Sequence, residues 1–150
     1  MLRALILALS MSPAVAFAHD YKAGDLAIAH PVAKAITATA MTSAGFFSIT
    51  NEGDTDDALI EVRADFPRVE MHDTITDDAG IAKMMQMMSV PLPAGETVTF
   101  ERGAKHVMFM GLGGIALEDG DKVDAVLVFE KAGEVEIQFN IEDLMQAHDH

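Results

Sequence analysis

Residues 134–141, with the sequence EVEIQFNI, alternate polar and apolar side chains without a fault. Successive side chains of a strand point to opposite faces, so this pattern predicts a half-buried β-strand. Residues 123–130 form a plausible partner strand, because Lys131-Ala132-Gly133 supplies a turn between the two segments. A chain with this signal is constrained to contain a sheet with one face buried.

Short strand signals recur along the rest of the chain, with turn residues between them. We predict further strands at residues 26–29, 33–40, 45–50, 58–64, 68–73, 84–88, 97–101 and 106–109. No amphipathic pattern of helical length with caps competes with them. Many short strands with this punctuation predict an all-β fold, an antiparallel β-sandwich with Greek-key connections.

The N-terminus has the parts of a secretory signal peptide. Arg3 gives a positive start, residues 4–9 form an apolar core too short to cross a bilayer, and Ala16-Phe17-Ala18 is a small-x-small cleavage site. We therefore predict secretion. The expected organisation is a signal peptide over residues 1–18, one sandwich domain over residues 19–145 and a flexible His-containing tail over residues 146–150.

The chain has no cysteine and a formal net charge of −14. A lipoprotein needs a cysteine just after the cleavage site, so we expect no membrane anchor. The lack of thiols is compatible with an oxidising compartment and excludes a blue-copper electron-transfer site, which requires a thiolate. The acidity argues against nucleic acid and anionic lipid as partners, because lysine and arginine are needed to meet phosphate.

His72, Met84, His106 and Met108 supply two imidazole nitrogens and two thioether sulfurs. Thioethers favour Cu(I) over harder ions, imidazole accepts copper, and neither group must lose a proton near neutral pH. His106 and Met108 are two residues apart in a predicted strand, so they project from one face. A turn at residues 77–80 would return Met84 close to His72. These four residues are therefore a candidate Cu(I) site.

Other histidines and methionines have plainer roles. His30 precedes Pro31 outside this spacing and is predicted to be structural. Further methionines are expected to be core fillers or substitute sulfur donors, namely Met87 and Met88 in the first role, Met85 in the second and Met110 in either. His19, His148 and His150 offer nitrogen and oxygen donors without sulfur, a set suited to Cu(II).

The donor spacing resembles that of the periplasmic copper chaperones of the PCuAC type. His72 is followed after eleven residues by Met84, and twenty-one residues later by His106 and Met108. Three further segments are similar to landmarks of the family: Lys22 to Leu26 with His30-Pro31, Ala44-Gly45-Phe46-Phe47, and Pro91 to Glu96. The chain departs from the family at Val32, where an aromatic residue is expected, and at Met85-Gln86, where a basic residue and a proline are expected.

The resemblance extends over residues 21–144, and what it implies is specific. It implies a cupredoxin-like, immunoglobulin-like sandwich in the periplasm that binds Cu(I) through the four donors. It also implies a copper-accepting partner, a subunit or assembly factor of cytochrome c oxidase with its dinuclear copper centre. We further expect a monomer.

Three functional classes compete for this chain. The first is the copper chaperone. The second is a copper enzyme that uses the amine and imidazole of His19 as one end of a histidine brace. The third is a non-metal β-sandwich acting as a binding module. The sequence has no Gly-x-Ser-x-Gly, His-Glu-x-x-His or phosphate-loop motif, which weakens the second class, and the full donor set weakens the third. We therefore expect a chaperone and not an enzyme.

Overall fold

The computed structural model describes residues 21–145, and these residues form eleven β-strands and no helix. The strands are β1 (Tyr21–Ala23), β2 (Leu26–Lys34), β3 (Thr42–Asn51), β4 (Asp57–Ala64), β5 (Arg68–Thr76), β6 (Ala82–Met87), β7 (Val90–Leu92), β8 (Thr97–Phe100), β9 (His106–Met110), β10 (Lys122–Phe129) and β11 (Gly133–Glu142). The predicted all-β class is confirmed. In this part of the chain no helix is available to span a membrane.

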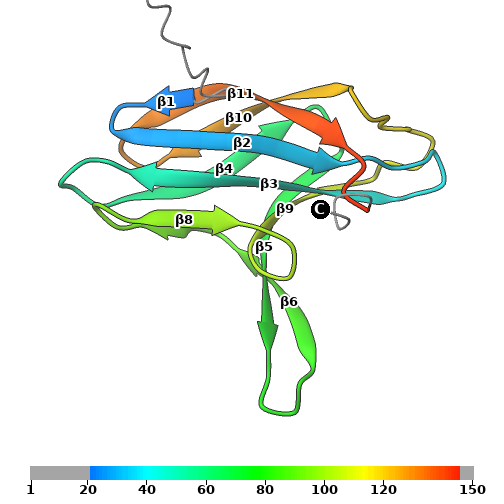
Figure 1. Ribbon diagram of the computed structural model, residues 1–150, viewed down its shortest axis with the longest axis horizontal. Helices are drawn as coiled ribbons and strands as arrows, with labels where there is room; N and C mark the ends of the chain where they lie inside the picture. The colour runs from blue at the N-terminus through cyan, green and yellow to red at the C-terminus, as the bar shows by residue number, and fades with distance from the viewer. Residues whose placement is uncertain (1–20, 146–150) are drawn as a thin grey trace, which may run out of the picture.

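One hydrogen-bonded path links most of the strands in the order β6-β5-β9-β3-β2-β11-β10-β4-β7. β1 joins this path at β2, and β8 joins it at β3. The pairs are antiparallel except for β11 with β2, which is parallel. The path folds over on itself around a shared core (Figure 1). This arrangement is the predicted sandwich.

The core lies between strands that do not pair with each other. Phe139 of β11 packs with its ring centroid 5.9 Å from that of Phe47 in β3 and 5.5 Å from that of Phe109 in β9. Gly45 of β3 lies beneath these rings, and an added Cβ would sit 3.0 Å from Phe139 and 3.1 Å from Phe109. Because glycine has no side chain, β3 can approach the rings of Phe109 and Phe139 closely at this position.

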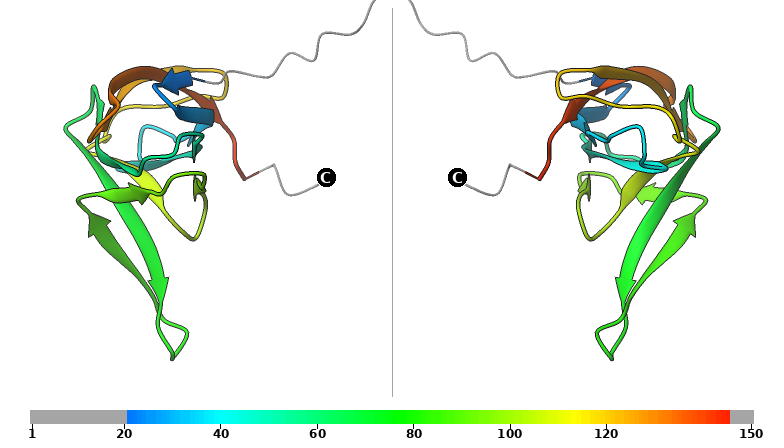
Figure 2. Two further views of the ribbon diagram at one scale, coloured as in Figure 1. Left: turned by 90° about the vertical axis from the view of Figure 1, so that its left-hand side faces the viewer. Right: turned by 90° about the vertical axis from the view of Figure 1, so that its right-hand side faces the viewer.

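The β5–β6 hairpin projects away from the sandwich body (Figure 2). β6 ends the path and pairs only with β5, and its residues from Ala82 to Gln86 are exposed. The turn is built by Asp77, whose Oδ1 accepts hydrogen bonds from the backbone N–H groups of Ala79 at 3.0 Å and Ile81 at 2.9 Å. The hairpin thus presents both of its faces to solvent near its tip.

Two strand predictions need correction. Residues 26–29 and 33–40 were expected to be separate strands, but residues 26–34 form the single strand β2, and residues 35–41 lie outside it. The register shifts between Ala29 and Val32, where His30 has a φ of 51°. A bulge at this point accommodates Pro31, which lacks an N–H, so the proline does not end the strand.

The predicted pairing of β10 with β11 is confirmed over eight residue pairs, from Lys122 with Asn140 to Phe129 with Gly133. β1 and β7 were not predicted, because three residues are too few for alternation to be recognised. The predicted signal peptide and the predicted tail lie outside the described residues, as do His19, His148 and His150.

Candidate metal site

Two histidines from segments far apart in the sequence lie side by side. β5 and β9 are neighbouring strands, and His72 is the direct cross-strand partner of His106. Their ring centroids are 5.8 Å apart. His106 is only 5% exposed, and His72 is half-buried. The sequence predicted both residues as donors, and the register of β5 on β9 brings them together.

Hydrogen bonds fix which nitrogen of each imidazole carries the proton. His106 Nδ1 lies 3.0 Å from the carbonyl oxygen of Ala104, and a carbonyl only accepts, so Nδ1 is the donor. His72 Nε2 lies 2.8 Å from Glu70 Oε2, and an ionised carboxylate also only accepts. Each ring therefore keeps a lone pair on its other nitrogen.

Those other nitrogens are His72 Nδ1 and His106 Nε2. Both are buried, and neither has a hydrogen-bond partner within the described structure. A buried polar atom left unpaired costs about 1–3 kcal/mol, so two such atoms in one place call for a ligand. A bound metal ion would satisfy both lone pairs, and the oxygen held by each opposite nitrogen is the arrangement seen at metal-binding histidines.

A short chain of charges holds the His72 ring. Arg68 Nε lies 2.8 Å from Glu70 Oε1, while the other oxygen of the Glu70 carboxylate accepts from His72. Asp73 takes a different part, since its carboxylate lies 3.5 Å from Lys105 Nζ on the other face of β5. Glu70 and Asp73 are the two carboxylates nearest to His72 along the chain, and either could contact its imidazole. The structure gives this contact to Glu70.

Met108 lies on the same face of β9 as His106. Val107 and Phe109, which alternate with them, have no exposed surface and belong to the core. Met108 is the cross-strand partner of Glu70 and is half-buried. The predicted placement of one imidazole and one thioether on a single face of the strand is therefore present.

Met110 is the next residue on this face, and its sulfur is already engaged. Arg68 Nη2 donates to Met110 Sδ at 3.3 Å. This contact makes Met110 a less suitable substitute donor than the sequence suggested, because a metal would have to displace the guanidinium.

Met84 also lies on the His72 face, but closer to the hairpin tip. Its cross-strand partner is Thr74, and its side chain is 59% exposed. Met85 pairs with Asp73 and therefore faces the opposite side. The structure thus brings His72, His106 and Met108 together and places Met84 diagonally from His72.

The remaining methionines of this run differ in burial. Met87 packs against the core beside its partner Met71, as predicted. Met88 is 76% exposed, so its prediction as a core filler is wrong. The predicted strand over residues 84–88 ends at Met87, and Met88 follows an edge strand with no further element to cover it.

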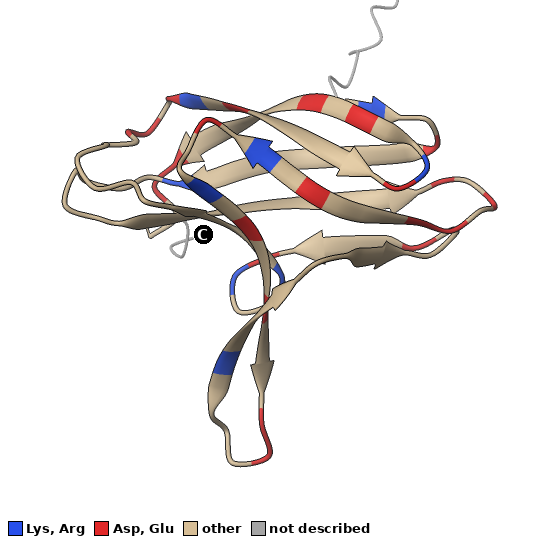
Figure 3. Cartoon of the chain, turned by 180° about the vertical axis from the view of Figure 1, so that it is seen from behind, with Lys and Arg blue, Asp and Glu red and all other residues tan. Residues whose placement is uncertain are grey.

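Thioether sulfurs are the further donors that lie beside the two imidazoles. Across residues 21–145 no group of three or more histidine, aspartate or glutamate side chains is arranged to hold a metal ion. Two imidazoles alone make an incomplete shell, and thioethers are the neighbouring donors. Seen from behind, the projecting end of the hairpin shows one basic position on β6 and an acidic tip (Figure 3), and the basic residue in the sequence of β6 is Lys83.

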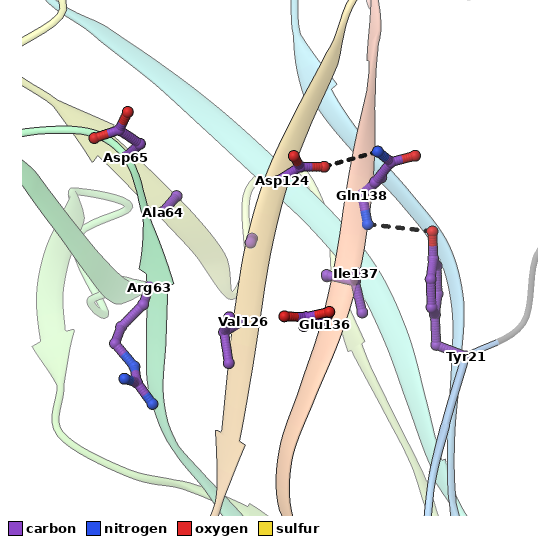
Figure 4. Close-up of a pocket in the computed structure, with 10 residues that line it drawn as sticks. Tyr21, Arg63, Ala64, Asp65, Asp124, Val126, Glu136, Ile137 and Gln138 are labelled. Carbon is purple, nitrogen blue, oxygen red and sulfur yellow. Dashed lines mark hydrogen bonds between the residues drawn. The ribbon is translucent and has the colours of Figure 1, made fainter.

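A groove elsewhere lacks this chemistry. It has a volume of about 580 Å³ and lies over β4, β10 and β11 (Figure 4). Gln138 donates to Asp124 at 2.7 Å, and the Tyr21 hydroxyl accepts from the Gln138 backbone N–H at 3.2 Å. Arg63 is paired with Glu134. These polar groups satisfy one another, and the groove is separate from the histidine pair.

Comparison with known proteins gives a consistent picture. The family model described as "Putative lipoprotein LpqE-like" matches residues 26–141. A copper-bound PCuAC domain from PmoF2 is 30% identical, with 83% of this chain and 97% of that chain covered and a TM-score of 0.69. An apo PCuAC domain from PmoF1 is also 30% identical, with 83% and 98% covered and a TM-score of 0.71.

A more distant solved structure shares the fold alone. Apo-DR1885 from Deinococcus radiodurans is 22% identical, with 95% of this chain and 94% of that chain covered and a TM-score of 0.62. No curated protein matches the sequence.

Proposed function

The chain belongs to the LpqE-like family and is a domain of the PCuAC type, and from this premise we propose that it is a periplasmic copper chaperone. It binds one Cu(I) through His72, Met84, His106 and Met108. The observation that carries the proposal is the pair of buried lone pairs on His72 Nδ1 and His106 Nε2, which nothing else in the described structure satisfies. A PCuAC domain of 30% identity has been solved with copper bound, which supports the choice of metal.

The donors divide between the sandwich body and the exposed hairpin. His106 and Met108 are on β9, which pairs with β3 and β5 within the sandwich. Ala104 and Glu70 hold the two rings, so the imidazoles are set before the metal arrives. Met84 is on the exposed hairpin and completes the shell when the hairpin bends toward β9. The shell is neutral and soft, which suits Cu(I) better than Zn(II).

Release proceeds by ligand exchange. A thioether is neutral and sits on a flexible stem, so the Met84 sulfur can leave as an acceptor's ligand arrives, with no change of proton or electron. Because Met84 is the exposed donor, the acceptor approaches along the hairpin. This is a carrier function and not catalysis. The acceptor we propose, from the family resemblance, is the dinuclear copper centre of cytochrome c oxidase or one of its assembly factors.

X-ray absorption on protein titrated anaerobically with Cu(I) tests the proposal, because nitrogen and sulfur shells are counted separately. We expect one Cu(I) per chain, with both a nitrogen and a sulfur shell. An equal concentration of Zn(II) should not displace it. His106→Ala is the informative variant, since it removes one of the two buried lone pairs. Equal competition by Zn(II), or a shell without sulfur, would contradict a Cu(I) site built on these residues.

A further inference from the structure

The strand register places the hairpin methionines on two sides of His72. Gln86 is the direct partner of His72 on β6, so residues 84 and 88 are its two diagonal neighbours. Diagonal neighbours on one face have Cα atoms about 7–8 Å apart, within reach of long side chains. Met84 and Met88 are therefore equally near to His72 along the strand direction.

Met88 lies on the same face as Met84. Met87, the last residue of β6, turns toward the core beside Met71. Met88 comes next, at a bend just past β6, and its 76% exposure is what alternation continued by one residue would give it on the outer face. Its side chain consequently belongs with those of His72, Glu70 and Met108.

The two hairpin sulfurs differ in their distance from Met108. Glu70 is the partner of Met108, and the β5–β6 pairing ends at Met71 with Met87, so that one further step of the register would set Met88 opposite Glu70. Two strand spacings then separate Met88 from Met108, about 10 Å between Cα atoms. Met84 is four residues further along the hairpin, which makes its separation from Met108 about 16 Å. In this conformation Met88 is the hairpin sulfur nearer to Met108.

We propose that Met88 is a further copper ligand, which shares the metal with His72, His106 and Met108 in the conformation seen here and exchanges with Met84 when the hairpin bends. This inference rests on the proposed Cu(I) site. In the exchange one copper–sulfur bond forms as another breaks, and neither protons nor electrons are transferred. Met88 is the most exposed of the three sulfurs, so it is also the first that an acceptor would meet.

The experiment compares variants made on a Met84→Leu background. If Met88 supplies the second sulfur, Met84→Leu alone keeps the sulfur count of the parent in X-ray absorption. Adding Met88→Leu should then remove one sulfur and weaken Cu(I) binding about tenfold or more in chelator competition, since even partners beyond the ligand shell are worth 10–100-fold.

The matched control adds Met85→Leu to the same background. Met85 is 55% exposed on the same strand but faces the other side, so this double variant should behave as Met84→Leu does. Loss of one sulfur in Met84→Leu alone would overturn the role of Met88, as would a Met88→Leu double variant no weaker than the control. Failure of the proposed function looks different, because the parent itself would then lack Cu(I) binding with nitrogen and sulfur shells.

Discussion

Replacing Glu70 by Ala tests whether the orientation of His72 matters to metal binding. Glu70 accepts from His72 Nε2 at 2.8 Å and is the contact that leaves the lone pair on Nδ1. Without it, either tautomer and other ring rotations become accessible. Loss of such an orienting partner weakens metal binding about 10–100-fold, or about 1.4–2.8 kcal/mol.

The same substitution should leave the apo protein folded, because a domain is stable by about 5–15 kcal/mol. The Glu70 ion pair with Arg68 joins a carboxylate that is 16% exposed to a guanidinium that is 64% exposed. The ion pair with its exposed partner contributes about 0–1 kcal/mol, and loss of the hydrogen bond to the half-buried His72 costs about 1–3 kcal/mol, so the free energy of unfolding of the apo protein should fall by about 1–3 kcal/mol. We therefore expect the Glu70→Ala protein to remain folded while its affinity for Cu(I) falls.

Chelator competition for Cu(I), together with urea unfolding of the apo protein, measures both quantities. Asp73→Ala is the matched control, because Asp73 is three residues away on the same strand but contacts Lys105 on the opposite face. The control should bind Cu(I) as the parent does. A Glu70→Ala protein with parental affinity, or an equal loss in Asp73→Ala, would refute the assignment of Glu70.

Three other changes have distinct expected outcomes. Met108→Leu should weaken Cu(I) binding while leaving the urea midpoint nearly unchanged, and parental affinity would show that the sulfur comes from elsewhere. Gly45→Ala should destabilise the fold by about 1–3 kcal/mol in urea unfolding, because its Cβ would meet the rings of Phe109 and Phe139; an unchanged midpoint would mean that these rings shift freely. Deleting residues 147–150 should lower the Cu(II) stoichiometry seen by calorimetry and spare Cu(I) binding, whereas an unchanged Cu(II) stoichiometry would remove any role for these histidines.

The fold was predictable where alternation was long. β11 has Ile137, Phe139 and Ile141 buried at every second residue, and both its face and its partner β10 were identified correctly. The His30-Pro31 bulge was not, because a proline ordinarily marks a strand boundary and the compensating shift depends on β3. Alternation along one segment shows which face of a strand is buried, whereas the position of a bulge depends on the neighbouring strand.

The candidate site was predictable as a set of donors but not as an arrangement. Spacing placed His106 and Met108 on one face, and the turn returned Met84 toward His72, as the β5–β6 register shows. The contact between His72 and His106 depends on β5 lying beside β9, which sequence spacing does not encode. The choice of Glu70 over Asp73 follows from alternation, since Glu70 is two residues from His72 on the same face of β5 and Asp73 is on the other face.

The projecting hairpin gives this molecule two levels of cooperativity. β6 has a single neighbouring strand, so its amide protons should exchange through local opening, at a lower free energy than the global unfolding that exposes β9 and β11. A metal ion bound to residues of both the hairpin and β9 would oppose that local opening. Binding would raise the free energy of this local opening by an amount that grows with the logarithm of the ratio of free metal to the dissociation constant. The hydrogen-exchange protection of β6 would therefore measure how much of the site is occupied. Copper binding would then appear as slower hydrogen exchange in the hairpin, while exchange in the sandwich strands serves as the reference.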